Sequence, residues 1–266
     1  MHKSIAPLSQ PVPPSASARR RQAGLGVAVS LFLSVALCAQ TGTQPPPDAE
    51  ADAPVVAVHD PLEGFNRVMF RFNDGVFTYA LRPLNRGYEF VVPRPLRRGL
   101  SNAFDNVNFP VRFVSSLLQG KVRRATRETG KFVVNTVGGV GGLFRPAEKI
   151  PALANLPEED MGQVLGAWGL PAGPYVVLPL LGPSSPREFL GFAGDYVLTP
   201  TNWDSLDVGN REWIADDYRT AVSAAGFLGK LPSVVGGYDG ATRDAIDPYI
   251  AVRDGYFSHR AAEIGK

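Results

Sequence analysis

The sequence predicts a mainly α-helical protein that is exported across a membrane. From residue 60 onward, apolar residues recur at alternating steps of three and four, and prolines and glycines divide this pattern into segments of helical length. The first 38 residues have the organisation of a secretory signal. A chain of 266 residues with 44% hydrophobic content can bury the core of one ordinary domain.

Residues 1–38 are expected to be a signal peptide of the lipoprotein type. They begin with a polar region that ends in Arg19-Arg20-Arg21, and an uncharged, leucine-rich stretch from Ala23 to Ala39 follows. This stretch is shorter than the roughly 20 residues of a membrane-spanning helix. The paired arginines leave a twin-arginine signal as an alternative route across the inner membrane.

Cys38 is the only cysteine of the chain, so it cannot form an internal disulfide. Val35-Ala36-Leu37-Cys38 resembles a bacterial lipobox, although Leu37 stands where a small residue is usual. We therefore expect Cys38 to be the lipid attachment site. The alternative is an ordinary signal peptide that uses Ser34-Val35-Ala36 as its small-residue cleavage site.

Residues 39–59 are expected to form a flexible tether, and residues 60–266 the helical domain. The tether is rich in proline, alanine and aspartate and has almost no large apolar residue before Val55, so it cannot form a core. Without residues 1–38 the chain has 23 basic and 25 acidic residues, and this balance offers no basis for binding nucleic acid. The arginines around Arg94–Arg98 and Arg123–Arg127 fit either anionic headgroups or a solvated helix face.

Proline and capping residues predict where each helix begins and ends. We expect the first helix to be capped by Asp60, with Pro61 at its first position, and to stop at Pro83. Pro95 should open a second helix, broken at Pro110 and ended by Gly120. The remaining helices are expected from Val122 to Thr136, from a Ser185 cap to about Val197, from about Gly209 to Leu228, and from Asp247 to about Glu263.

Two segments do not fit a helical pattern. Gly138 to Asp160 begins with four glycines in five residues and is expected to be a long mobile loop. Gly162 to Gly182 is apolar but interrupted by glycine and proline, so it cannot form a continuous spanning helix. It fits either an irregular segment at membrane depth, covered by protein, or a buried hairpin in an ordinary core.

The chain lacks the residue patterns of the common enzymes. Of its three histidines none stands with another at metal-ligand spacing, and neither a phosphate-binding P-loop nor a G-x-S-x-G nucleophile elbow is present. We expect no metal, no cofactor and no enzymatic activity.

Ordered motifs along the chain resemble the MlaA/VacJ lipoprotein family. They begin with Asp60-Pro61-Leu62-Glu63-Gly64-Phe65-Asn66-Arg67 and Phe72-Asn73. The later ones include Pro93-Arg94-Pro95, Leu117-Leu118-Gln119-Gly120, Phe132-Val133-Val134-Asn135-Thr136, Gly141-Gly142, Gly162-Gln163-Val164-Leu165-Gly166, Gly173-Pro174-Tyr175 and Asp247-Pro248-Tyr249. The resemblance covers roughly Asp60 to Phe257.

The resemblance implies a ring-like single domain of amphipathic helices, embedded in the inner leaflet of the outer membrane and anchored there by lipid. It implies binding to a trimeric outer-membrane porin and an amphipathic channel through the ring. Mislocalised phospholipid would leave the outer leaflet through this channel and pass to a soluble periplasmic lipid carrier, which preserves lipid asymmetry. Helices without a spanning segment suit a protein that lies in one leaflet.

Three residues are candidates for the channel or lipid path: Phe72, Asn73 and Asn135. The two amides suit a polar passage because an amide inside an apolar ring needs a partner, although either could be a satisfied structural amide. Gly138, Gly139, Gly141 and Gly142 are candidates for a gating hinge, since glycine changes backbone conformation at low cost.

Two other functions remain open at this point. A lipoprotein that only binds porins or organises the envelope would need the same anchor and helices but no passage. An envelope hydrolase that acts on phospholipid would need a site assembled from distant acidic or serine residues, for example Asp195, or Asp216 with Asp217.

Overall fold

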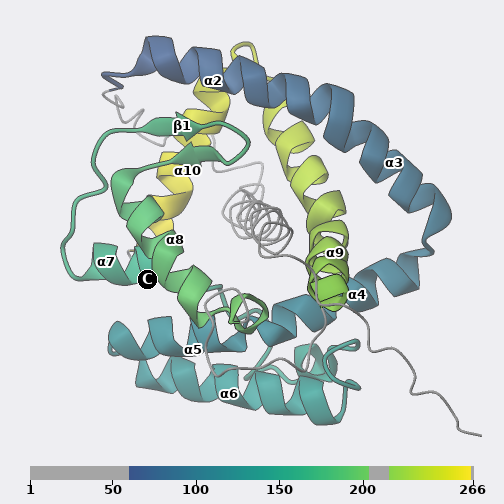
Figure 1. Cartoon of the computed structure of the whole chain (residues 1–266). Coiled ribbons are helices and arrows are strands. Elements are labelled where there is room, and N and C mark those ends of the chain that lie inside the picture. Colours follow the sequence, from purple (N-terminus) through teal and green to yellow (C-terminus); the bar gives the residue numbers. More distant parts are fainter. Residues whose placement is uncertain (1–59, 204–215, 265–266) are drawn as a thin grey trace, which may run out of the picture.

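The computed structural model describes residues 60–203 and 216–264. The expected signal peptide, tether and lipid attachment site at Cys38 lie outside the described residues. Mainly α-helical architecture is confirmed: helices follow one another around a ring, and a small β-hairpin lies on one side of it (Figure 1).

The first side of the ring is one long arc, which consists of α2 (Glu63–Val76), the π-helical segment η1 (Phe77–Leu81) and α3 (Arg82–Val91). The opposite side is formed by α4 (Arg94–Val107), α5 (Phe109–Leu118) and α6 (Val122–Val137). The remaining elements are η2 (Pro146–Lys149), α7 (Met161–Ala167), β1 (Val176–Leu178), β2 (Gly182–Ser184), α8 (Pro186–Leu198), η3 (Pro200–Asn202), α9 (Asp216–Thr242) and α10 (Pro248–Ile264). Helices α9 and α10 run between the two sides (Figure 1).

The expected stop at Pro83 is wrong, because helical structure continues past it. In a regular α-helix the proline ring would collide with the carbonyl four residues earlier. Here η1 widens the helix just before Pro83, and the Arg82 N–H donates to the Phe77 carbonyl, five residues back. Pro83 therefore falls in the first turn of α3, where its missing N–H costs little.

The N-terminal boundary of α2 also differs from the expected one. The helix begins at Glu63 rather than at Pro61, with Leu62 in the cap position. Asp60 still satisfies this end of the helix, since its Oδ1 accepts the Leu62 N–H at 3.2 Å. The aspartate thus acts one turn outside the helix.

Several expected boundaries are confirmed. The helix break lies at Asn108, and Pro110 stands in the first turn of α5. Ser185 caps α8 by accepting the Glu188 N–H. Helix α9, in contrast, continues beyond the expected end at Leu228 to Thr242 and contains Pro232, so that prediction was too short.

The segment from Gly162 to Gly182 forms a short helix followed by a buried hairpin. Strands β1 and β2 are antiparallel, with Val177 opposite Pro183. Tyr175 and Val177 are fully buried and form the apolar core with Tyr249 of α10. Of the two interpretations of this segment, the hairpin agrees with the observed backbone.

Candidate functional site

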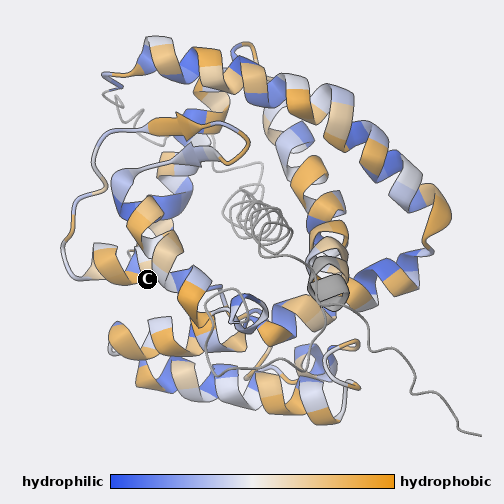
Figure 2. Ribbon diagram, viewed as in Figure 1, coloured by the Kyte–Doolittle hydropathy of each residue, from blue (hydrophilic) through white to orange (hydrophobic). Residues whose placement is uncertain are grey.

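Helix α2 is amphipathic in the reverse sense of a helix in a water-soluble protein. Its fully buried residues are Asn66 and Asn73, and Met69 and Phe70 pack partly buried against the core. Phe65, Val68 and Phe72, in contrast, are 50%, 55% and 49% exposed. Figure 2 shows that polar and apolar residues share every helix of the ring. A helix normally turns its apolar stripe toward the core. We therefore expect the outward apolar face of α2 to contact an apolar environment.

The same inversion continues around the ring. The described residues bury more polar or charged side chains than apolar ones. Large apolar side chains are instead exposed on α3, α6 and α8, including Phe90, Val91, Val133, Val137, Phe189, Leu190 and Val197. Apolar exposure on this scale marks a surface that binds a membrane or another protein. No helix among the described residues is both long and apolar enough to cross a bilayer.

Asn66 and Asn73 attach the hairpin to α2. The Asn66 amide donates to the Tyr175 carbonyl at 3.0 Å and accepts from the Val177 N–H at 2.8 Å. Two helical turns later, the Asn73 amide donates to the Leu178 carbonyl at 2.9 Å and accepts from the Leu180 N–H at 2.6 Å. The two amides thus replace a neighbouring strand along β1.

Tyr238 of α9 attaches the middle of the arc. Its ring stacks on Phe77 with centroids 4.1 Å apart, and its hydroxyl donates to Asp74 at 2.9 Å. Burial and the Asp74 carboxylate raise the pKa of the Tyr238 hydroxyl above its ordinary value. Arg82 reinforces the joint through an ion pair with Asp239 at 2.7 Å.

Asn135 lies on α6 and fixes the start of the loop from Gly138 to Asp160. Its side-chain oxygen accepts the Ala147 N–H at 3.1 Å, and its backbone carbonyl accepts the Gly142 N–H. The side chain is 4% exposed, and the structure gives this amide a structural partner.

The four glycines at the start of the loop are not equivalent. Gly141 and Gly142 have φ of +70° and +93°, which favour glycine. A Cβ on Gly139 would lie 2.2 Å from the Phe144 carbonyl oxygen and 2.3 Å from that of Asn135, whereas Gly138 ends α6 with ordinary helical geometry. The turn is therefore closely packed against its own backbone.

We expect Gly139→Ala to destabilise this turn by several kcal/mol, since backbone atoms on two sides would have to move. Gly64→Ala is the matched control, because nothing lies within 4 Å of the added methyl group and alanine favours the helix. Thermal unfolding of the two variants in the same detergent measures the difference. Equal melting temperatures would show that the turn relaxes freely.

A cavity of about 80 Å³ lies where six helices meet, and many charged residues line it. Its lining includes nine charged side chains from α4, α5, α9, the end of the long loop, α8 and α10. They are Asp105, Arg112, Glu158, Glu159, Asp160, Asp195, Lys230, Arg260 and Glu263. Carboxylates outnumber cations two to one in the lining, and cations from outside the lining pair with two of them: Arg145 with Asp105, and Lys121 and Arg124 with Glu159.

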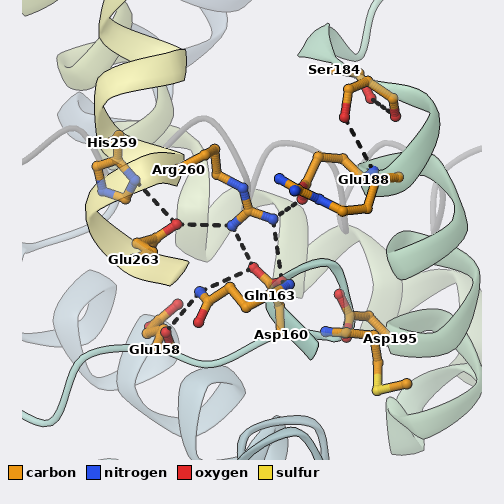
Figure 3. Close-up of polar contacts among 12 residues, drawn as sticks. Glu158, Asp160, Gln163, Ser184, Glu188, Asp195, His259, Arg260 and Glu263 are labelled. Atoms are coloured by element: carbon orange, nitrogen blue, oxygen red, sulfur yellow. Dashed lines mark hydrogen bonds and ion pairs between the residues drawn. The ribbon is translucent and has the colours of Figure 1, made fainter. Parts of the chain in front are cut away.

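Arg260 of α10 binds several carboxylates in and beside the lining of the cavity (Figure 3). Its guanidinium donates to Asp160 and Glu263 at 2.7 Å and 2.9 Å and pairs with Glu188. Arg260, Glu188 and Glu263 are all buried. This guanidinium therefore links α10 to α7 and α8, and it balances carboxylates that would otherwise repel one another.

Asp195 of α8 stands in the same cluster without a cation partner among the described residues. It accepts the Met161 N–H at 2.9 Å, which holds it beside Asp160 at the start of α7. Burial and the neighbouring Asp160 carboxylate raise the pKa of Asp195 well above its ordinary value, while the Met161 hydrogen bond opposes this shift.

A raised aspartate pKa makes stability depend on pH with a definite sign. The folded state keeps the Asp195 proton to higher pH than the unfolded chain, so protonated Asp195 contributes to the free energy of unfolding at low pH. This contribution is lost as the pH rises from the ordinary aspartate pKa, near 4, through the raised pKa of the folded state. We expect Asp195→Asn to lose less unfolding free energy over this range than the wild type. Asp244→Asn, at an exposed position, should follow the wild-type curve; a parallel curve for Asp195→Asn would contradict the expectation.

The predicted site residues do not meet at one point. Phe72 and Asn73 lie on α2, and Asn135 lies on α6 on the opposite side of the ring (Figure 1). The grouping of Asp160, Asp195 and Arg260 could not be recognised from the sequence. Only the position of Asp160 before α7 gave a local signal, that of a helix cap. No group of His, Cys, Asp or Glu in residues 60–203 and 216–264 is arranged to hold a metal ion.

Comparisons with known proteins agree with this architecture. The family model described as MlaA lipoprotein matches residues 58–263. The "Intermembrane phospholipid transport system lipoprotein MlaA" of Escherichia coli strain K12 is 34% identical over 74% of this chain and 75% of its own length. The protein of the same name from Haemophilus influenzae is 30% identical over 76% of this chain and 77% of its own length.

A solved structure extends the likeness to three dimensions. It is described as a "Structural basis for maintenance of bacterial outer membrane lipid asymmetry". It is 32% identical to this chain, has a TM-score of 0.59, and the match covers 77% of this chain and 99% of that one. Both the sequence and the fold therefore place the chain in the MlaA lipoprotein family.

Proposed function

We propose that this protein removes mislocalised phospholipid from the outer leaflet of the outer membrane and passes it to a soluble periplasmic carrier. The family indicates phospholipid transport, since its named relatives belong to an intermembrane phospholipid transport system. For this chain, the main support is the apolar side chains that face outward from the ring. An apolar outer surface on helices that do not span a bilayer suits a protein lying in one leaflet.

The anchor and the protein partners are part of the same proposal. Cys38 would be acylated and hold the ring at the periplasmic leaflet of the outer membrane, and a trimeric porin would cover part of the apolar surface. Metabolic labelling with a fatty-acid probe tests the anchor. Label should enter the wild type and be absent from Cys38→Ser.

The lipid path would use the candidates on α2 and α6 in different ways. Phe72 is half exposed and can contact acyl chains directly. Asn73 and Asn135 hydrogen-bond to backbone groups, so they would act by fixing the hairpin and the glycine turn. The family's amphipathic channel remains our proposal for the passage itself.

The loop from Gly138 to Asp160 would be the gate, with Gly138, Gly139, Gly141 and Gly142 as its hinge. In the structure the loop lies against α4, where the Asn102 amide donates to the Leu143 carbonyl at 3.1 Å. Arg145 of the loop also pairs with Asp105 of α4. These contacts hold the loop in one position, and an opening motion would have to break them.

A disulfide across this contact tests the gate. In Asn102→Cys/Leu143→Cys, oxidation is expected to stop lipid export, and reduction should restore it. Each single cysteine variant controls for loss of the native side chain. Export that continues through the oxidised protein would exclude this loop as the gate.

Depletion of the protein in its own host tests the function. We expect phospholipid to accumulate in the outer leaflet, measured with a membrane-impermeant amine-reactive probe, and re-expression to restore asymmetry. A porin-binding lipoprotein without a passage would leave asymmetry normal. A hydrolase would instead release lysophospholipid or free headgroup from vesicles incubated with the purified protein.

A further inference from the structure

The two walls of the cavity differ in the charged groups that lack a close partner. The wall from α4, α5 and α9 contributes Asp105, Arg112 and Lys230, but Arg112 pairs with the buried Glu128 at 2.9 Å and Asp105 pairs with Arg145. The wall from the end of the loop, α8 and α10 is dominated by carboxylates, among them Asp160 and Asp195. A ligand that bears both a negative and a positive group would complement the two walls.

The first wall has a cation that is only loosely paired. Lys230 is 4% exposed, and its Nζ lies 3.5 Å from Asp105 Oδ1. The carboxylate of Asp105 is also bound by Arg145. A buried ammonium is costly unless it is well paired. Lys230 can therefore gain from an anion in the cavity.

Most carboxylates of the second wall already have cation partners. Arg260 is shared among Asp160, Glu188 and Glu263, and Glu159 pairs with Lys121 and Arg124. Among the described residues, Asp195 accepts the Met161 N–H and forms no ion pair with a cation. Glu158 stands exposed at the opening of the cavity. An ammonium group would add the missing positive charge and donate charge-assisted hydrogen bonds.

Size limits which part of a ligand can enter. A volume of about 80 Å³ holds a small polar group but no acyl chain. Helix α8, which contributes Asp195, exposes Phe189, Leu190 and Val197 elsewhere on its surface. A lipid could therefore keep its chains on apolar surface while its headgroup reaches the cavity.

We propose that this cavity is a headgroup subsite for zwitterionic aminophospholipid, with the phosphate toward Lys230 and the ammonium toward Asp160 and Asp195. The inference rests on the proposed transport function and deepens it, because it names the headgroup that the protein selects. Anionic lipid without an amine would satisfy only the first wall.

Lipid retention by the purified full-length protein tests this assignment. The protein in detergent is incubated with vesicles of equal phosphatidylethanolamine and phosphatidylglycerol with the same acyl chains, and the retained lipid is measured by mass spectrometry. We expect the wild type to retain the ethanolamine lipid about tenfold over the glycerol lipid. Asp195→Asn should move this ratio toward one, and Lys230→Met should lower retention of both lipids. Exposed Asp244→Asn and Arg243→Met are the matched controls.

Three outcomes would overturn the assignment. Equal retention of the two lipids by the wild type, or an unchanged ratio in a folded Asp195→Asn, would remove headgroup selection. Competition by soluble phosphoethanolamine as strong as that by the lipid would assign the cavity to free amino phosphates. These outcomes are separate from failure of transport, because the depletion experiment reports total outer-leaflet phospholipid whatever the headgroup preference.

Discussion

Arg260→Met is expected to lower the free energy of unfolding by about 3–5 kcal/mol, the cost of leaving buried charges without their partner. The guanidinium contacts Asp160, Glu188 and Glu263, which lie on or next to three different helices. Methionine fills similar space without the charge, so the loss reports electrostatics more than packing. Chemical denaturation in a fixed detergent measures it.

Arg243→Met is the control for this variant. Arg243 pairs with Asp239 at 3.8 Å, but its side chain is 73% exposed, so water replaces most of what is lost and we expect less than about 1 kcal/mol. If Arg260→Met is equally mild, the remaining partners, such as Arg187 beside Glu188, must suffice, or the three carboxylates must be neutral or solvated in the folded protein. The fold would then not depend on the Arg260 guanidinium.

Asn66→Ala is expected to cost about 2–6 kcal/mol, because it leaves the Val177 N–H and the Tyr175 carbonyl without partners in a fully buried position. Asn73→Ala should cost less, since Leu180 beside it is 40% exposed and water can reach the freed groups. Thermal unfolding followed by circular dichroism ranks the two variants.

Asn102→Ala serves as the reference for Asn66→Ala, because it removes one exposed amide hydrogen bond, to Leu143. We expect its melting temperature to stay near that of the wild type. An Asn66→Ala variant as stable as Asn102→Ala would mean that the hairpin finds other partners. The double amide attachment would then be dispensable.

Local features of the fold could be predicted from the sequence because their causes lie within a few residues. Ser185 caps the helix that starts at the next residue, and Pro110 breaks the helix next to it. The end of α9 could not be placed in this way. Its continuation past Leu228 depends on tertiary contacts, in which Leu231, Val234 and Val235 are buried.

The polar cluster could not be predicted because its members are far apart in the sequence. Asp160 and Arg260 are 100 residues apart, and neither lies in a pattern that names the other. The inverted helices posed a different difficulty. Periodicity identifies two faces of a helix but does not say which of them faces the core, and here α2 buries asparagine.

The π-helical segment Phe77–Leu81 gives the long arc a tolerance to changes in length. A π turn holds about one residue more than an α turn, so removing one residue there would restore an α turn and keep α3 in nearly the same rotation. The same deletion within α2 or α3 would rotate every following residue by about 100°. Phe90, which is 92% exposed, would then leave the apolar surface. Natural variation in chain length along this arc should therefore concentrate in this segment.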